Sequence, residues 1–209
     1  MLSKILALAS LLWRVIDKFF DLLNMLIYAI ECRLKGITKH AEIVITGPRN
    51  AGKTTLVHKL RTDSTNKQVH WRRGMISTAH LDHKHIRFMF IEPGGLAAPP
   101  VFGFLRSANA LLLIVDGTDY DYDGTFGEAR SMLDALLERD EIRGVPVAIF
   151  VNKIDRPGAV GPEEFMALMG FEYGGLDGIW RERAVEVFFG SVVVGQGIQE
   201  VIEWLSQHV

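Results

Sequence analysis

The chain has 209 residues, a length that suits one domain with an appendage. Hydrophobic residues make up 48%, charged residues 23% and aromatic residues 10%, values that exclude a wholly disordered or collagen-like chain. The 23 lysines and arginines nearly balance the 25 aspartates and glutamates, so the chain lacks the basic surplus typical of a nucleic-acid-binding protein. The single cysteine, Cys32, excludes an internal disulfide bond and a zinc site built from cysteines.

Residues 1–34 are rich in apolar side chains and follow one helical pattern. Charged residues interrupt the segment, and its longest charge-free runs, Ile5–Trp13 and Leu22–Ile30, fall well short of the ~20 residues that cross a bilayer. On a helical projection the charged residues occupy one arc and the opposite face is apolar. The sequence therefore predicts an amphipathic helix within an extension of residues 1–40, followed by a globular domain of residues 41–209.

The apolar face of this helix can pack against the protein's own core, lie in the interface of a membrane, or bind a partner protein. We favour a membrane or a partner, because a globular domain follows at once and can fill its own core. Charges of both signs on the polar face make attraction to anionic lipids weak. Leu2 in place of glycine excludes N-myristoylation, and we interpret Cys32 as a small hydrophobic side chain rather than a lipidation site.

A phosphate-binding loop follows the first predicted strand, Glu42–Thr46. The segment Gly47–Thr54 reads GPRNAGKT and matches the pattern GxxxxGK[ST], with a strand before it and a helix after it. In such a loop the backbone N–H groups surround the β-phosphate, while Lys53 contacts the β- and γ-phosphates and Thr54 ligates Mg²⁺. The predicted phosphate-binding residues are Asn50, Ala51, Gly52, Lys53, Thr54 and Thr55.

A second motif selects the base of the nucleotide. The buried strand predicted for Val145–Val151 ends in Asn152-Lys153-Ile154-Asp155, an NKxD sequence. The Asp155 carboxylate accepts from the N1–H and the exocyclic amine of guanine, the Asn152 amide bonds the purine edge and the loop, and the Lys153 stem covers the ring. Alternating strands and helices bring both motifs to the carboxyl edge of one sheet, which predicts a guanine-nucleotide site there.

Four aspartates follow the strand predicted for Ala110–Val115, namely Asp116, Asp119, Asp121 and Asp123. Their spacing lacks the glycine and the terminal glutamate of a calcium-binding loop. We therefore interpret this stretch as a solvated acidic loop beside the nucleotide.

Beyond these motifs, the sequence resembles the Arf (ADP-ribosylation-factor-like) family of Ras-like small GTPases over about residues 42–209. The stretches that carry the likeness are Ile86–Leu96 (IRFMFIEPGGL), Ala110–Asp119 (ALLLIVDGTD), Gly127–Leu133, Arg139–Gly144 and Gly195–Leu205 (GQGIQEVIEWL). The resemblance implies an α/β fold of the P-loop NTPase class, a Ras-like G domain whose six-stranded, mostly parallel sheet carries helices on both faces. It also implies GTP or GDP and Mg²⁺ as ligands.

The resemblance assigns further residues to the site. Gly95 supplies a backbone N–H to the γ-phosphate, while Ser191 and Val192 occupy the place of the family's loop near the base. Glu92 stands where the family has the aspartate that holds Mg²⁺ through water, so Thr54 and Glu92 are the expected metal ligands. Leu96 stands where the family has the glutamine that orients the attacking water.

The departures from the family pattern predict that the protein binds guanine nucleotide but hydrolyses GTP very slowly or not at all. A leucine neither accepts from nor donates to water, and counting back from Glu92 to the place of the first-switch threonine reaches Arg73 instead. No residue is therefore assigned a catalytic role, and whether the protein is an enzyme stays open.

Two functions agree with this sequence. The leading interpretation is a guanine-nucleotide-binding Arf-like small GTPase at a membrane surface, cytoplasmic and peripheral on an endomembrane. The alternative is a nucleotide-bound structural subunit, a pseudo-GTPase, in a membrane-associated complex of an organelle. Both interpretations use residues 1–34 to dock on a membrane surface or a membrane-associated protein complex, and neither involves nucleic acid.

Overall fold

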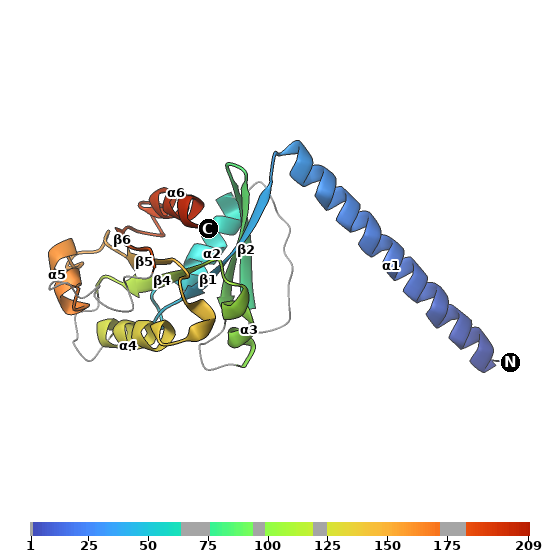
Figure 1. Cartoon of the computed structure of the whole chain (residues 1–209), viewed down its shortest axis with the longest axis horizontal. Helices are drawn as coiled ribbons and strands as arrows, with labels where there is room; N and C mark the ends of the chain where they lie inside the picture. Colours follow the sequence, from blue (N-terminus) through green and yellow to red (C-terminus); the bar gives the residue numbers. More distant parts are fainter. Residues whose placement is uncertain (1, 64–75, 94–98, 119–124, 172–182) are drawn as a thin grey trace. The chain divides into compact units, whose positions relative to one another are not determined.

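The computed structural model describes residues 2–63, 76–93, 99–118, 125–171 and 183–209. Figure 1 shows the elements of the chain in sequence order. Backbone contacts divide the chain into two compact units, Met1–Lys39 and His40–Val209.

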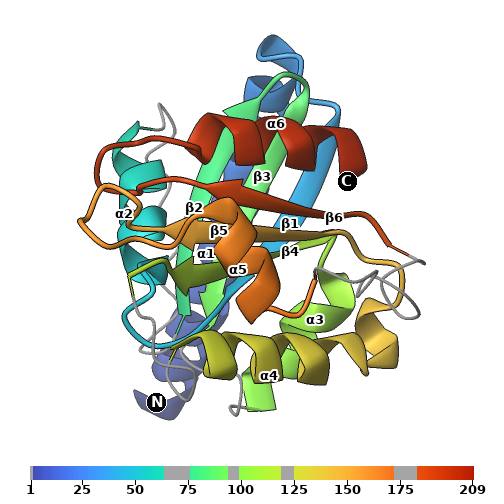
Figure 2. The same ribbon diagram turned by 90° about the vertical axis from the view of Figure 1, so that its left-hand side faces the viewer.

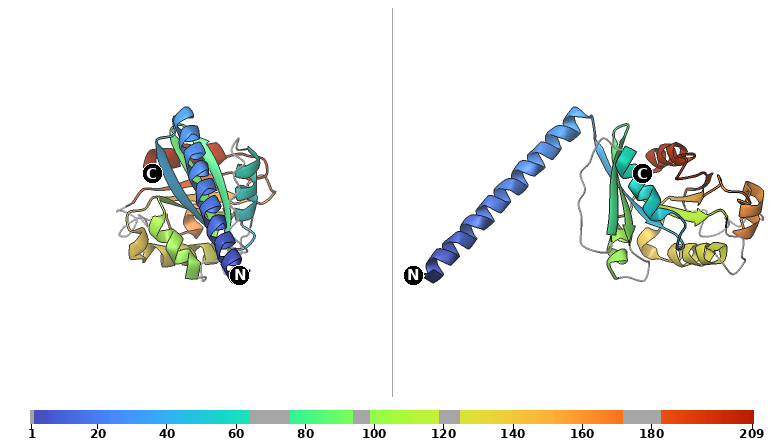
Figure 3. Two further views of the ribbon diagram at one scale, coloured as in Figure 1. Left: turned by 90° about the vertical axis from the view of Figure 1, so that its right-hand side faces the viewer. Right: turned by 180° about the vertical axis from the view of Figure 1, so that it is seen from behind.

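The first unit is formed almost entirely by one helix, α1 (Leu2–Leu34), which runs without a break (Figure 3). It is followed by Gly36, whose φ of 65° lies in the left-handed region that favours glycine. The Ile37 N–H donates to the Cys32 carbonyl (2.8 Å) and the Gly36 N–H to the Arg33 carbonyl (3.3 Å), the two hydrogen bonds of a Schellman motif. None of the described helices is long and apolar enough to span a membrane.

The second unit is built on a six-stranded sheet with the order β2-β3-β1-β4-β5-β6. The strands are β1 (Lys39–Thr46), β2 (Ile76–His83), β3 (Ile86–Pro93), β4 (Ala110–Asp116), β5 (Val147–Asn152) and β6 (Val185–Phe189). β2 and β3 form an antiparallel hairpin, whereas β1, β4, β5 and β6 pair in parallel. Every residue of β4 and β5 is buried, as expected for parallel strands covered on both faces.

Helices cover both faces of this sheet (Figure 2). They are α2 (Lys53–Asp63), α3 (Pro99–Ser107), α4 (Thr125–Leu137), α5 (Pro162–Leu168) and α6 (Ile198–His208), with a short 3-10 helix, η1, at Asp140–Ile142. Successive side chains of β4 point to opposite faces of the sheet, so each face has its own hydrophobic core. Leu112 packs with the apolar residues of α2 and α6, and Leu113 packs with those of α3, α4 and α5. The predicted P-loop NTPase fold, a mostly parallel six-stranded sheet preceded by an N-terminal helix, is confirmed.

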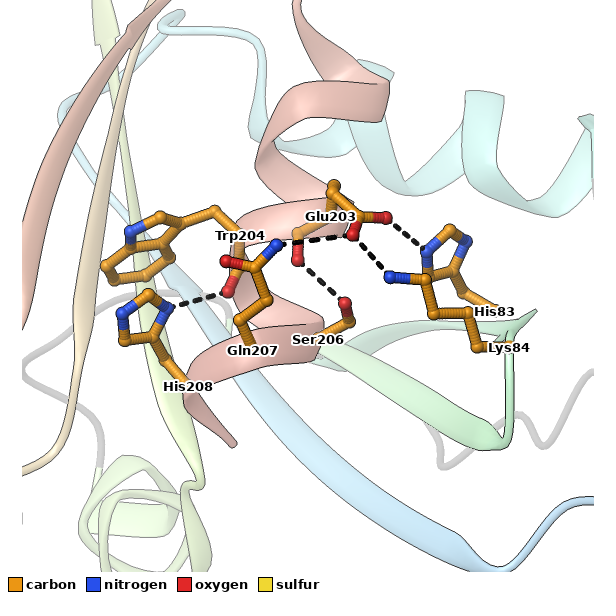
Figure 4. A network of polar contacts seen from close by, with 7 residues as sticks. All are labelled: His83, Lys84, Glu203, Trp204, Ser206, Gln207 and His208. Atoms are coloured by element: carbon orange, nitrogen blue, oxygen red, sulfur yellow. Dashed lines mark hydrogen bonds and ion pairs between the residues drawn. The ribbon is translucent and has the colours of Figure 1, made fainter.

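The tip of the β2–β3 hairpin is held to α6 by one carboxylate (Figure 4). Glu203 accepts hydrogen bonds from the Lys84 ammonium group, from Nε2 of His83 (3.0 Å) and from Nε2 of Gln207 (3.2 Å). Lys84 lies in the hairpin turn with a φ of 54°, and its ammonium group reaches Glu203 on α6 (Figure 4). The hydrogen bonds from Lys84, His83 and Gln207 together lower the pKa of Glu203 to about 2.

The substitution Glu203→Gln should lower the urea midpoint of unfolding at pH 7. The folded state depresses the pKa of Glu203 from 4.5 to about 2, so its contribution is present above pH 4.5 and is lost as the pH falls toward 2. The difference between wild type and variant should therefore shrink over that pH range, and also with added salt, because Glu203 is half-exposed.

Glu186→Gln is the matched control, because Glu186 is exposed on β6 and makes no hydrogen bond or ion pair with any of the described residues. A midpoint difference for Glu203→Gln that stays constant from neutral pH to pH 2 would contradict this assignment.

Candidate functional site: polar loops at the carboxyl ends of the strands

The predicted phosphate loop connects the end of β1 at Thr46 to the start of α2 at Lys53. Gly47 begins it with a φ of 136°, and a Cβ there would lie 2.0 Å from the carbonyl oxygen of Ile114 on β4. Only glycine fits where the chain passes so close to the neighbouring strand. Asn50, at the turn of the loop, has a φ of 60°.

The start of α2 supplies the donors that a phosphate needs. The Leu56 N–H donates to the Gly52 carbonyl (2.9 Å) and is the first donor within the helix, so the N–H groups of Lys53, Thr54 and Thr55 have no acceptor in α2 itself. A helix N-terminus of this kind favours a bound anion.

Lys53 turns back over the loop that precedes it. Its ammonium group donates to the carbonyls of Gly47 (2.8 Å) and Pro48 (2.5 Å). Burial lowers the pKa of Lys53, while the charges of Glu92 and Glu128 act in the opposite direction. The loop thus holds a partly buried cation, the group that the motif provides for the β- and γ-phosphates.

The two expected metal ligands, Thr54 and Glu92, lie in direct contact. The Thr54 hydroxyl donates to Oε1 of Glu92 at 2.7 Å. Oε2 of Glu92 is buried and has no hydrogen-bond partner among the described residues. A hydroxyl and a buried carboxylate oxygen without a partner fit Mg²⁺, which takes one or two protein oxygens and completes its shell with phosphate and water.

Two residues expected at the γ-phosphate cannot be placed beside this pair. Gly95 and Leu96 lie in the segment 94–98, outside the described residues. Within the described ranges, no group of three or more His, Cys, Asp or Glu forms a metal centre of its own.

Asn152, the first residue of the NKxD motif, joins the phosphate loop to the loop after β6. The side chain is buried at the end of β5, with Nδ2 donating to the Ala51 carbonyl (2.7 Å) and Oδ1 accepting from the Val192 N–H (2.9 Å). A Cβ on Gly52 would lie 2.2 Å from Nδ2 of Asn152, so the second glycine of the loop is required by this contact. The amide therefore ties together three loops of the site.

Lys153 is held by Asp116, which the sequence had assigned to a solvated loop. It pairs with Oδ2 of Asp116, whose Oδ1 accepts from the Thr118 N–H (3.0 Å) and hydroxyl (2.7 Å). Burial would raise the pKa of Asp116, but the hydrogen bonds from Lys153 and Thr118 outweigh it and lower the pKa.

The assignment of Asp116 to a solvated acidic loop is wrong, because this residue is the buried last residue of β4. Asp119, Asp121 and Asp123 lie outside the described residues. The parallel register aligns Asp116 with Asn152, beside the NKxD motif. The position of Asp116 directly after the apolar run Ala110–Val115 was the sequence signal for its burial.

The remaining residues predicted at the base lie close to Asn152. The Ile154 N–H donates to the Gly190 carbonyl (3.2 Å), which joins the NKxD turn to the loop that contains Ser191 and Val192. Ser191 and Val192 are buried, and the Val192 N–H is already bonded to Asn152. Asp155 is exposed, and within the described residues no hydrogen bond or ion pair occupies its carboxylate.

The arrangement places the polar groups at the carboxyl ends of parallel strands. The phosphate loop follows β1, Asp116 ends β4, the NKxD motif ends β5, and Ser191 follows β6. This edge is where open α/β sheets bind ligands.

Comparison with known proteins gives a consistent result. A sequence model of the ADP-ribosylation factor family matches residues 15–209. The chain is 29% identical over 170 residues to ADP-ribosylation factor 3 of Arabidopsis thaliana, which covers 80% of this chain and 87% of the relative. It is 29% identical over 174 residues to ADP-ribosylation factor-like protein 8b, also of Arabidopsis thaliana (80% and 86% covered), and 25% identical over 173 residues to ADP-ribosylation factor-like protein 1 of Caenorhabditis elegans (82% and 90% covered). Because the family model spans most of its length, the chain belongs to the ADP-ribosylation factor family of small GTPases.

Proposed function

We propose that this chain is a guanine-nucleotide-binding small GTPase that works at a membrane surface and turns over GTP very slowly. The observation that carries the nucleotide site is the buried Asn152 amide, which fixes the phosphate loop against the loop beside the base. The domain of residues 41–209 binds the nucleotide, and the extension of residues 1–40 attaches the protein.

The proposed nucleotide contacts use the hydrogen-bond donors and acceptors that the site presents. The N–H groups at the start of α2 and the Lys53 ammonium group face the phosphates, once Lys53 exchanges the carbonyls of its own loop for phosphate oxygens. Thr54 and Glu92 hold Mg²⁺, which supplies positive charge to the β- and γ-phosphate oxygens when bound. The Asp155 carboxylate accepts from N1–H and the exocyclic amine of guanine, and the Asp116 ion pair holds the Lys153 stem along the ring.

The substitution Asp155→Asn should lower the affinity for GDP by about 100-fold or more, because two donors of guanine lose a charged acceptor worth roughly 1.5–3 kcal/mol each. The same variant should gain affinity for xanthosine diphosphate, whose C2 oxygen accepts from the new amide. Calorimetry with GDP and with xanthosine diphosphate measures the loss of one affinity and the gain of the other.

The gain with xanthosine diphosphate shows that the variant is folded and serves as an internal control. Unchanged GDP affinity in the variant would refute the role of Asp155. Absence of heat from the wild-type protein with GDP and with GTP would overturn the proposed function itself.

Slow hydrolysis rests on the sequence at the γ-phosphate. Leu96 cannot orient water by hydrogen bonding, and the phosphoryl-transfer transition state depends mainly on such positioning and on electrostatic stabilisation. The absence of a threonine at the first-switch spacing removes a second contact of the family. The same departures favour the alternative of a nucleotide-bound structural subunit in a membrane-associated complex, which would hold its nucleotide without exchange.

Release of γ-phosphate from a preformed GTP complex should be far slower than in an ordinary small GTPase, when followed in a single turnover. Leu96→Gln alone should not restore ordinary turnover, because the switch threonine is still missing. Turnover of the wild-type protein at the ordinary rate would contradict the proposal. A nucleotide that exchanges with the medium supports the switch, whereas a nucleotide that does not exchange supports the structural subunit.

The membrane role rests on the apolar side chains of α1. Its exposed large apolar side chains are Leu11, Leu12, Trp13, Val15, Ile16, Phe19, Phe20, Leu22, Leu23, Met25, Leu26, Ile27, Ile30 and Leu34. They occupy a broad arc rather than the narrow seam of a two-stranded coiled coil, and aromatic and leucine side chains on one face are typical of a helix in a membrane interface. The polar face carries charges of both signs, including Arg14, Asp17 and Lys18.

The substitution Leu23→Glu should strongly reduce flotation of the full chain with vesicles of neutral phosphatidylcholine, because it places a charge in the apolar arc. Asn24→Glu adds the same charge one residue away on the polar face and should leave flotation nearly unchanged. Wild-type binding should depend little on salt, since the charges of the polar face nearly cancel. Equal losses in the two variants, or no flotation of the wild type, would contradict a membrane-bound helix and favour a protein partner.

A further inference from the structure

We propose that Glu92 ligates the divalent cation of the nucleotide complex directly through its Oε2 atom, instead of through a water molecule. The inference rests on the proposed nucleotide function and deepens it. It concerns the one residue that replaces the aspartate of the family pattern at this position.

The two carboxylate oxygens of Glu92 have different surroundings. Oε1 accepts from the Thr54 hydroxyl at 2.7 Å, so the carboxylate already lies at the position of the expected metal ligand. Oε2 is buried and has no hydrogen-bond partner among the described residues, in a side chain that is only 9% exposed. A buried carboxylate oxygen without a partner is costly, and a cation beside Thr54 removes that cost.

The length of the side chain supports direct contact. A carboxylate that acts through a metal-bound water keeps its oxygen roughly 4 Å from Mg²⁺, whereas a direct ligand lies at about 2.1 Å. The additional methylene of glutamate extends the carboxylate by about 1.3 Å and adds one rotatable bond. Glu92 lies opposite Ser77 in the β2–β3 ladder, so its backbone is fixed and the extra reach is directed to the Thr54 side.

Direct ligation changes what surrounds the metal. In a six-coordinate GDP complex, Thr54, Glu92 and one β-phosphate oxygen leave about three positions for water, against about four when the carboxylate acts through water. One more anionic ligand also binds the cation more tightly.

The test is to count the waters bound to Mn²⁺ in the Mn²⁺–GDP complex of the full chain, by electron paramagnetic resonance in ¹⁷O-enriched water. Wild type should show about three waters, and Glu92→Asp, which shortens the side chain, should show about one more. Glu92→Gln should weaken Mn²⁺ binding by about tenfold or more, because an amide oxygen is a weaker ligand for a hard cation. Glu128→Gln is the control. The charge of Glu128 raises the pKa of Lys53, and its removal should leave the water count unchanged.

The wild-type count decides the question even if a variant fails to fold. A count of about four waters in wild type, equal to that of Glu92→Asp, would overturn direct ligation while leaving GDP binding intact. A protein that binds no GDP would overturn the proposed function, and this inference with it.

Discussion

The buried side chain of Asn152 is the contact on which the geometry of the site depends. Its amide satisfies the carbonyl of Ala51 in the phosphate loop and the N–H of Val192 in the loop after β6. Without it, two buried backbone groups would lose their partners, at a cost of roughly 1–3 kcal/mol each. The requirement for glycine at position 52 has the same origin, because a Cβ there would overlap this amide. The phosphate loop and the loop after β6 are therefore held together by a single side chain.

The charges of the site are prepared in the protein before any ligand arrives. Lys53 is held by two carbonyls of its own loop, and Lys153 is held by Asp116. The two lysines differ in whether they must change hydrogen-bond partners when a nucleotide binds. Lys53 must leave neutral acceptors for a phosphate, which is a stronger, charged acceptor. Lys153 is already held by its carboxylate partner, so in the proposed complex its stem would lie along the base with little side-chain freedom left to lose.

The sequence predicted most of the fold because its signals are local. Unbroken apolar runs identify the buried parallel strands, and the glycines and lysine of the phosphate loop identify the turn between β1 and α2. Contacts between distant segments were not predictable in this way. The pairing of Asp116 with Lys153 follows from the parallel register of β4 and β5, and that of Lys84 with Glu203 joins residues that lie 119 positions apart.

The position of Asp116 in its strand explains why its assignment to a solvated loop was wrong. Composition alone describes Asp116 as one of several aspartates in a polar segment. Its burial depends on being the last residue of a strand that is covered on both faces, with Lys153, the residue after the neighbouring strand β5, paired to it. A buried carboxylate is stable there because the ammonium group and Thr118 offset its loss of hydration.

The departures at Glu92 and Leu96 act in the same direction. A carboxylate that ligates the metal directly strengthens the complex with GTP before reaction and in the transition state alike, so it raises affinity without lowering the barrier to hydrolysis. Leu96 removes a contact to the attacking water that would be made mainly in the transition state. In the proposed function, these two changes would therefore favour holding a bound nucleotide over hydrolysing it, both in a slow switch and in a structural subunit.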